Sequence, residues 1–478
     1  MLFNAPDFLF AFLPAFLAVY FAAPAGLKNL VLLLASLFFY FTTSGELTLV
    51  LLASILVNHL VAHRMHRATP AASQAWLAAG VALNLAPLLY YKYAHFFFTS
   101  LGEGAAVLGW HPAVPDLHPI LPIGISFFTF QAISYIADVY WRRVTPAARL
   151  IDFGMYHACF PQLIAGPIVR YEEIEPEVHR RAHRLVDVYN GVVQFCFGLG
   201  KKVILADPAG VLADKAFSLP TAPDAAGHLT FAAAWIGIAA YTIQIYADFA
   251  GYSDMAIGLG RMLGFPYPEN FDQPYRARSI TEFWRRWHMT LSRWFRDYLY
   301  IPLGGNRVGL ARTLFNLAVV FFLCGLWHGA AWTFVAWGLF HGALLVMERL
   351  WRRWGPAWWR PPALLGWLYT ILAVMGGWVL FRAETLTGAA GYLRVMLHWP
   401  VSIGTVSPGL AAILTPDRLT YLALGAAVAL IPYQPWLDFT GRRWHFGPAA
   451  AGGALVVAAV AIVMASVASF TPFIYFRF

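Results

Sequence analysis

Long apolar segments are the feature that most constrains this chain. Runs close to the roughly 20 residues of a membrane-spanning helix recur throughout its 478 residues, and only 12% of the residues are charged. Soluble proteins average about 25%. We therefore predict an integral membrane protein with about twelve candidate segments, near residues 8–24, 29–43, 46–62, 75–93, 120–140, 186–205, 229–247, 312–327, 331–347, 364–381, 417–433 and 450–469.

Two further apolar segments, 151–168 and 249–265, contain prolines or several glycines. Backbone that is broken at membrane depth must be buried in protein or line a cavity, so we expect these segments to be re-entrant or tilted. The predicted fold class is an all-α polytopic membrane protein with about 11–12 transmembrane helices plus re-entrant and amphipathic interfacial helices. The absence of internal repeats and long linkers indicates a single membrane domain over residues 1–478.

The net charge of +9 comes from arginines that cluster between the apolar runs. Such clusters are typical of topology determinants and contacts with membrane lipids, and not of a nucleic-acid site. Placing the basic loops in the cytoplasm leaves both termini and the intervening loops at 95–118, 206–228 and 382–416 outside. The three cysteines stand alone in apolar segments, which predicts inert thiols without a disulfide or a metal site.

The densest polar stretch, Ser279 to Tyr298, has the pattern of one amphipathic helix of about six turns. Ser279 and Glu282 form a capping-box start, and Pro302 with the following glycines ends the element. One face is aromatic and the other is charged, which suits a helix lying at the membrane interface. The signature region that this helix opens runs over residues 279–342.

Two histidines stand out because they lie among apolar residues. His288 falls in the aromatic stripe of the amphipathic helix, and His328 ends the apolar run 312–327. Packing explains a single such histidine, but an ionisable group within a membrane segment is a candidate functional site. His341 is expected to pack or to hydrogen-bond. Small residues would let the two helices around His328 approach closely: Gly325, Gly329, Gly338 and Gly342.

Residues 284–307, WRRWHMTLSRWFRDYLYIPLGGNR, and residues 325–342, GLWHGAAWTFVAWGLFHG, resemble the signature of the membrane-bound O-acyltransferases. The similarity is to the bacterial branch that modifies alginate and teichoic acids. The resemblance implies a central funnel, a catalytic role for His328 and a role as second polar partner for His288. It also implies a multi-pass protein of the bacterial inner membrane.

The resemblance predicts transfer of an acetyl group from a cytoplasmic thioester donor, acetyl-CoA or another acyl thioester, toward hydroxyls of an exported polysaccharide or envelope polymer. No bound cofactor and no metal are expected. His328 would be the general base, since a neutral imidazole suits that task, and His288 would position a substrate or stabilise developing charge. A secreted or membrane-anchored acetyltransferase outside the membrane is the expected partner.

The charged face could attract the phosphates of the donor, or it could face lipid headgroups; both interpretations stay open. The candidate substrate-binding or donor-binding residues are Arg285, Arg286, Trp287, Arg293, Asp297 and Trp327. A straight helix over 312–327 would place His328 about 24 Å above its start, whereas His288 would lie near the surface. The two histidines can cooperate only if the amphipathic helix is sunk into the protein or the membrane is thinned.

Two other classes of function remain as alternatives: a transporter or flippase of an acylated intermediate, and a non-catalytic scaffold. The broken segment 249–265 favours a transporter, and the lack of a repeat counts against it. His59, His63 and His66 share a helical face, which is more typical of a solvated helix end than of a metal site. The His111 to Asp116 spacing is taken as a chance match. Three aspartates are expected to pair with arginines of the polar helix or to form an ion site: Asp138, Asp248 and Asp254.

Overall fold

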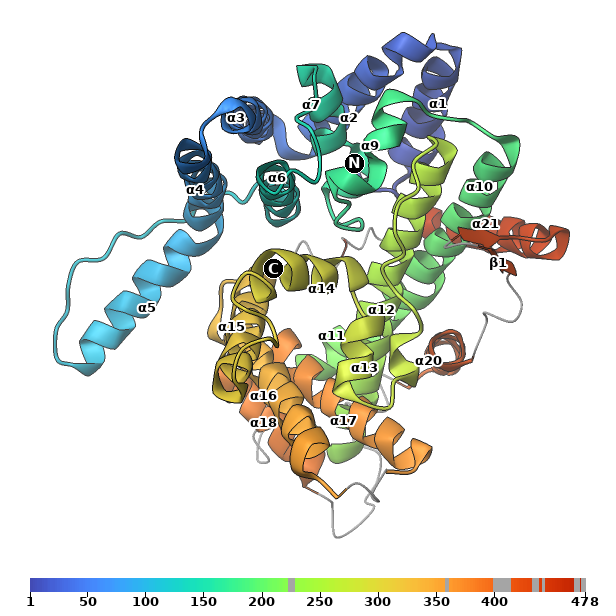
Figure 1. Cartoon of the computed structure of the whole chain (residues 1–478). Coiled ribbons are helices and arrows are strands. Elements are labelled where there is room, and N and C mark those ends of the chain that lie inside the picture. The colour runs from blue at the N-terminus through green and yellow to red at the C-terminus, as the bar shows by residue number, and fades with distance from the viewer. Residues whose placement is uncertain are drawn as a thin grey trace. The chain divides into compact units, whose positions relative to one another are not determined.

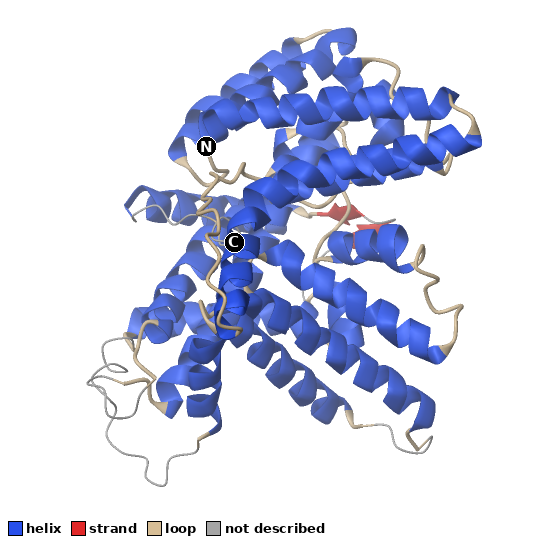
Figure 2. Ribbon diagram, turned by 90° about the vertical axis from the view of Figure 1, so that its left-hand side faces the viewer, coloured by secondary structure: helices blue, strands red, loops and turns tan. Residues whose placement is uncertain are grey.

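The computed structural model describes residues 1–221, 228–356, 361–398, 414–431, 438–440, 443–467 and 473. The described chain is helical almost throughout (Figures 1 and 2). Its strands are β1 (Asp438–Thr440) and β2 (Arg443–His445), which pair antiparallel with Asp438 opposite His445. The predicted all-α polytopic class is confirmed.

Five helical stretches among the described residues are long and apolar enough to cross a membrane: Ala25–Arg67, Pro70–Val107, Leu310–His328, Ala363–Arg382 and Pro448–Ser466. Their apolar side chains are often turned outward, as Phe38 and Leu49 show with 55% and 67% exposure. Exposed apolar surface of this extent fits contact with lipid chains. The predicted total of 11–12 spanning helices and the central funnel stay predictions.

The chain forms two compact units, Met1–Val192 with Ala256–Pro268, and Val193–Met255 with Glu269–Phe478. Their boundaries fall within two helices, α10 (Leu185–Gly200) and α12 (Phe231–Met262). Whether both units make a single membrane domain, as the sequence indicates, stays a prediction.

The first unit contains the N-terminal helices. In chain order they are η1 (Phe8–Phe12), α1 (Leu13–Ala22), η2 (Ala25–Leu27), α2 (Lys28–Ser44), η3 (Gly45–Leu47), α3 (Thr48–Arg67), α4 (Pro70–Leu88), η4 (Leu89–Tyr93), α5 (Ala94–Val107), α6 (Ile125–Tyr140), α7 (Leu150–Ala158), α8 (Phe160–Leu163) and α9 (Tyr171–His179). The predicted break in 151–168 is confirmed, because Cys159 separates α7 from α8.

Helix α6 forms the centre of this unit, since every residue from Ile125 to Val139 is buried. Helices α3 and α4 are joined by a reciprocal amide pair, in which the Nδ2 groups of Asn58 and Asn84 each donate to the other's Oδ1 at 2.9 and 2.7 Å. Both amides are buried, so the pair satisfies polar groups that would be costly to leave unpaired. The same helices therefore combine apolar packing with a specific polar contact.

The second unit contains the remaining helices and the two strands. After the end of α10 come η5 (Lys201–Ala206), α11 (Asp207–Phe217), most of α12, η6 (Pro274–Arg276), α13 (Ile280–Arg286), α14 (Met289–Phe295), η7 (Arg296–Tyr300), α15 (Leu310–His328), α16 (Trp332–Trp354), α17 (Ala363–Arg382), α18 (Leu386–Leu397), α20 (Pro416–Leu430) and α21 (Pro448–Val467).

The prediction that 249–265 is broken is wrong, because α12 continues without interruption to Met262. Glycines in this helix provide close contacts instead of breaks. A Cβ atom at Gly251 would lie 2.7 Å from the carbonyl oxygen of Gly198, and one at Gly198 would lie 2.6 Å from that of Gly251. Small residues thus let α10 and α12 approach closely, and the helix ends only where Gly264 adopts a positive φ of 84°.

Three predicted outer loops also contain helices. Helix α5 lies almost entirely within 95–118, α11 lies within 206–228, and α18 lies within 382–416. These segments are predicted as loops because they lie between the candidate spanning segments. Parts of the second and third segments, 222–227 and 399–413, fall outside the described residues.

Helices α15 and α16 pack closely through glycines, as the sequence predicts. A Cβ atom at Gly338 would lie 3.0 Å from the Cα of Gly325 and would clash with the carbonyl oxygen of Phe321. A Cβ at Gly342 would lie 3.1 Å from that of Phe321. The two helices therefore meet backbone to backbone just before His328.

Replacing Gly338 with Leu should destabilise the protein by about 1–3 kcal/mol or more, because overpacking forces the two helices apart. Thermal unfolding in detergent would measure the loss. Gly376→Leu on α17 is the matched control, since a Cβ there meets nothing within 4 Å. Equal melting temperatures for the two variants would contradict the close contact.

Candidate active site

The predicted single helix over Ser279–Tyr298 is wrong in one respect, because the structure divides it at Trp287 and His288. Helix α13 ends at Arg286, and α14 begins at Met289. His288 between them has a left-handed backbone with φ 43° and ψ 54°, which costs a non-glycine residue about 1–2 kcal/mol. A residue held in such a conformation points to a local constraint.

Asn270 supplies that constraint from outside the predicted helix. Its backbone carbonyl accepts from the Met289 amide at 2.9 Å, and its Oδ1 faces the His288 Nδ1 at 3.0 Å. The same Oδ1 accepts from the Thr290 amide (3.3 Å) and hydroxyl (2.9 Å), while Nδ2 donates to Ser253 Oγ at 3.1 Å. One buried amide therefore holds both the backbone and the ring of His288.

These contacts define the state of the His288 ring. Because the Thr290 amide must be a donor, the Asn270 atom that faces it is the oxygen, and His288 Nδ1 carries the proton. Burial lowers the pKa of His288 to about 3, so the ring is neutral at physiological pH. Its Nε2 is buried without a hydrogen-bond partner among the described residues. This nitrogen is therefore a hydrogen-bond acceptor.

His328 is the last residue of α15, as the sequence predicts, and only 3% of it is exposed. Its ring meets those of Trp327 and Trp337 edge-to-face, with centroids 4.9 Å apart in each case, and that of Phe381 on α17 at 5.2 Å. Three aromatic side chains therefore surround the imidazole at the end of the helix.

The ring of Trp327 lies next to the rings of both histidines. Its ring centroid lies 5.9 Å from that of His288 and 4.9 Å from that of His328. His288 is completely buried, so the polar segment is sunk into the protein and not laid on its surface. The condition under which the two histidines could cooperate is met.

His341 lies in the same aromatic cluster, with its ring 5.2 Å from those of both Trp284 and Trp337. It is fully buried. Neither of its nitrogens has a hydrogen-bond partner in the described part of the chain, and Gly377 of α17 leaves room for it, since a Cβ there would lie 2.7 Å from Nε2. The structure thus favours packing for His341.

The six residues predicted to bind substrate or donor fall into different environments. Trp327 lies between the histidines, whereas Trp287 is 1% exposed and packs against five aromatic rings. Arg286 binds Asp272 (2.9 Å) and Glu282 (3.0 Å), and Asp297 binds Arg296 at 2.6 Å. Trp287, Arg286 and Asp297 therefore have structural contacts. Arg293 is half-buried, and Arg285 is exposed.

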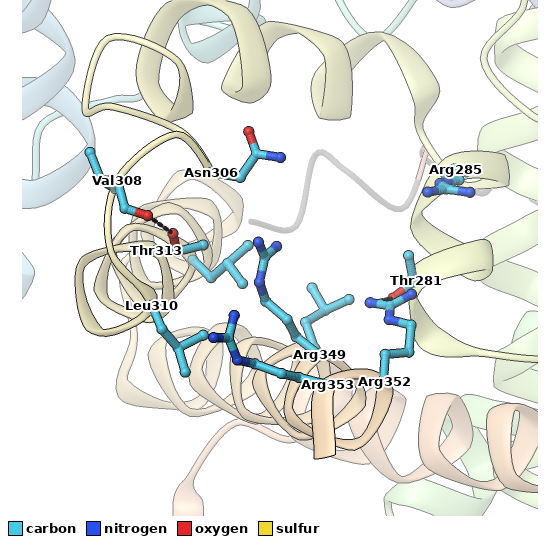
Figure 3. Close-up of a pocket in the computed structure, with 11 residues that line it drawn as sticks. Thr281, Arg285, Asn306, Val308, Leu310, Thr313, Arg349, Arg352 and Arg353 are labelled. Carbon is cyan, nitrogen blue, oxygen red and sulfur yellow. Dashed lines mark hydrogen bonds between the residues drawn. The ribbon is translucent and has the colours of Figure 1, made fainter. Parts of the chain in front are cut away.

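Arg285 faces a pocket of about 500 Å³ in the second unit. Figure 3 shows Arg285 on one side, Val308 and Thr313 on the other, and three arginines of α16 along the base. The lining residues are Thr281, Arg285, Asn306, Val308, Leu310, Thr313, Leu317, Leu345, Arg349, Arg352 and Arg353. Arg286, Trp287, Arg293 and Asp297 do not line it.

Glu348 of α16 fixes one wall of this pocket. Its carboxylate accepts from the backbone amides of Ile280 (2.6 Å) and Thr281 (3.0 Å) and from the Thr281 hydroxyl (2.6 Å). A negative charge at a helix N-terminus is favourable, so this contact holds α13 against α16. The predicted capping box is present only in part, because Ser279 Oγ accepts from the Glu282 amide (3.0 Å) but the Glu282 carboxylate accepts from the Arg278 amide.

Asn270 and Glu348 are the important residues that the sequence analysis missed. Asn270 binds His288, which lies 18 positions further along the chain, and Glu348 binds Ile280, which lies 68 positions before it. A local pattern does not reveal such contacts. Neither residue stands out locally, because Asn270 lies between Glu269 and Asp272 and Glu348 is followed by Arg349.

The three aspartates form ion pairs, but with cations outside the polar helix. The pairs join Asp138 to Arg143 (3.2 Å), Asp248 to Lys202 (2.8 Å) and Asp254 to Lys201 (2.6 Å). The structural interpretation is thus supported, with other partners than those predicted.

Local contacts support the predicted helix-end role for two of the three clustered histidines. His63 Nε2 lies 3.1 Å from the Ala147 carbonyl, and His66 Nδ1 lies 2.6 Å from Arg142. Among the described residues, the group with metal-ligand spacing is His95, Asp116 and His118, all exposed. Asp116 contacts His118 at 2.8 Å.

Comparison with known proteins adds an independent result. A model of the membrane-bound O-acyltransferase family matches residues 147–383. The chain is 47% identical over 392 residues to the probable alginate O-acetylase AlgI of Azotobacter vinelandii, covering 81% of this chain and 76% of that protein. It is 39% identical over 431 residues to the peptidoglycan O-acetyltransferase of Helicobacter pylori, covering 83% and 80%.

A more distant relative is the teichoic acid D-alanyltransferase of Bacillus subtilis, 29% identical over 258 residues, or 51% of this chain and 62% of that protein. The family match includes both histidines and the helices that hold them. The resemblance seen in residues 284–342 is therefore confirmed: this chain is an O-acyltransferase that belongs to the membrane-bound O-acyltransferase family.

Proposed function

We propose that this protein moves an acetyl group from a cytoplasmic thioester toward hydroxyls of an exported polysaccharide or envelope polymer, in the bacterial inner membrane. The observation that carries the proposal is the burial of His288 and His328 against the same ring of Trp327. Two relatives are named for O-acetyl transfer to a polymer, alginate in one case and peptidoglycan in the other. The acetyl group and the polymer class rest on these names.

The proposed reaction uses His328 as the general base. It takes the proton of the attacking hydroxyl while the hydroxyl oxygen bonds to the thioester carbonyl carbon. The carbon–sulfur bond then breaks and releases the thiolate, which receives the proton from His328. The aromatic rings around His328 limit the water that could hydrolyse the thioester.

His288 has a narrower role than the sequence indicates. Because its Nδ1 proton is directed to Asn270, the neutral ring offers only an acceptor at Nε2. It suits the positioning of a hydroxyl donor, and it does not suit the donation of a hydrogen bond to a developing oxyanion. Of the two roles considered for His288, we therefore propose substrate positioning.

The transporter alternative loses its main support. It rested on a broken segment at 249–265, and α12 is continuous to Met262.

The direct test uses purified protein in lipid vesicles with acetyl-CoA labelled in the acetyl group. We expect release of free coenzyme A and appearance of label in a hydroxyl acceptor when a partner-containing membrane extract is added. If thioester cleavage never exceeds that of protein-free vesicles, the proposed function is wrong.

Replacing His288 with Ala should lower the rate by about 5- to 150-fold, the range of one lost hydrogen bond of about 1–3 kcal/mol. His288→Asn should retain more activity, because Asn tolerates a left-handed backbone and can keep one hydrogen bond. His288→Gly separates backbone strain from chemistry, since Gly adopts this conformation freely. Near wild-type rates for all three variants would show that His288 only packs.

A further inference from the structure

The pocket next to α13 has an excess of positive charge. It is lined by Arg285, Arg349, Arg352 and Arg353, and in the described part of the chain none of the four forms an ion pair. Arg352 donates to the Thr281 hydroxyl at 3.2 Å. Glu348, the acid beside Arg349, is occupied by the α13 amides.

Other arginines of the second unit, in contrast, form ion pairs with carboxylates. Arg286 has two carboxylate partners, and Arg382 binds Asp214 at 2.6 Å. Four guanidinium groups around one pocket repel one another unless an anion lies between them. Guanidinium groups also match the oxygens of a phosphate in a bidentate arrangement. The pocket therefore has the chemistry of a site for a phosphorylated ligand.

The rest of the pocket lining has a different chemistry. Val308, Leu310 and Leu317 contribute apolar side chains near the start of α15, Leu345 adds one from α16, and Asn306 adds an amide. In Figure 3, Arg349 extends from α16 toward the side where Asn306 lies. A ligand that fits both surfaces carries phosphates together with an apolar or aromatic part.

Helix α15 joins this pocket to the candidate active site. Thr313 and Leu317 line the pocket, and His328 ends the same helix. At 1.5 Å per residue, the axial separation from His328 is about 22 Å for Thr313 and about 16 Å for Leu317. A ligand that has phosphates in the pocket and an acyl group at His328 must contain an arm of this length.

We propose that the pocket binds the phosphates of a phosphopantetheine-type thioester donor, namely the coenzyme A part of acetyl-CoA. This inference rests on the proposed function. The pantetheine arm has the length of four to five extended residues, about 13–18 Å. This length matches the axial separation from Leu317 to His328 and places the phosphates nearer to Leu317 than to Thr313. Acetyl phosphate does not fit, because its acyl carbon is attached directly to the phosphate group.

The test compares two donors that differ in their phosphates. In the double variant Arg349→Gln/Arg353→Gln, the KM for acetyl-CoA and the Kd for coenzyme A should rise at least about tenfold, as expected for one lost charge-assisted hydrogen bond, with kcat nearly unchanged. S-acetylpantetheine has no phosphate, so its kinetics should be the same in wild type and variant. Arg312→Gln is the matched control: Arg312 lies at the start of α15 over the Phe315 ring at 5.3 Å and does not line the pocket.

Three results would overturn the inference. One is an unchanged KM for acetyl-CoA in the double variant, and another is an equal rise for S-acetylpantetheine. The third is a variant that binds coenzyme A normally but no longer retains anionic phospholipid, which would assign the pocket to a lipid headgroup. Coenzyme A binding is measured without turnover, so it remains informative even if wild-type protein transfers no acetyl group and the proposed function fails.

Discussion

Acyl transfer should fall by at least about a hundredfold when His328 is replaced by Ala, the lower limit of what a general base contributes. The reason is that the alanine side chain cannot take the proton of the attacking hydroxyl. The measurement is O-acetylation of the host polymer in a strain that carries only the variant, together with thioester cleavage by the purified protein. Retained acetylation would end the assignment of His328 as the base.

The structure makes a packing control necessary for this experiment. His328 contacts three aromatic rings, and each such contact is worth about 0.5–1.5 kcal/mol, so His328→Ala also removes packing. His341→Ala loses comparable contacts with Trp284 and Trp337 in the same cluster and should remain active. His328→Phe keeps the ring without its nitrogens and should be inactive. Equal activity of the His328→Ala and His341→Ala variants would mean that the loss reflects packing.

The helices around the site could be predicted from local pattern, and their interruptions could not. Residues 312–327 were expected as a helix, and α15 spans Leu310–His328. The division at His288 was missed because the aromatic spacing continues through it. Its cause is Asn270, which is distant in the sequence and binds both the backbone and the ring. Hydrophobic periodicity reports which face is buried and contains no information on such a contact.

Glycines and arginines show the same limit of prediction from sequence, because the residue type does not reveal which neighbours the residue contacts in the fold. Gly251 in the sequence predicts a broken helix, yet in the structure it provides the contact of α12 with Gly198. Arg285 and Arg286 are adjacent and look equivalent in the sequence. In the structure, Arg286 is neutralised by two carboxylates, and Arg285 lines the pocket. Composition predicts that a basic segment exists, but only the three-dimensional partners show which of its charges remain available.

The protein alone should not acetylate the mature polymer. The predicted outer segments are short, the longest being 382–416, and the described part of that segment consists mainly of the helix α18 (Leu386–Leu397). We expect segments of this length to be too short to hold a polysaccharide chain. Since we place the donor in the cytoplasm and the acceptor outside, we expect a second protein to receive the acyl group.

Vesicles that contain acetyl-CoA inside and deacetylated polymer outside provide the test. With this protein as the only protein present, polymer ester should stay at the level of His328→Ala vesicles, because that variant has lost the proposed base. Adding a secreted or membrane-anchored acetyltransferase from the same cell should raise ester formation only in wild-type vesicles, since the partner depends on the acyl group that His328 helps to release. Robust ester formation without a second protein would show that the acyl group reaches the polymer directly, and the relay would then be wrong.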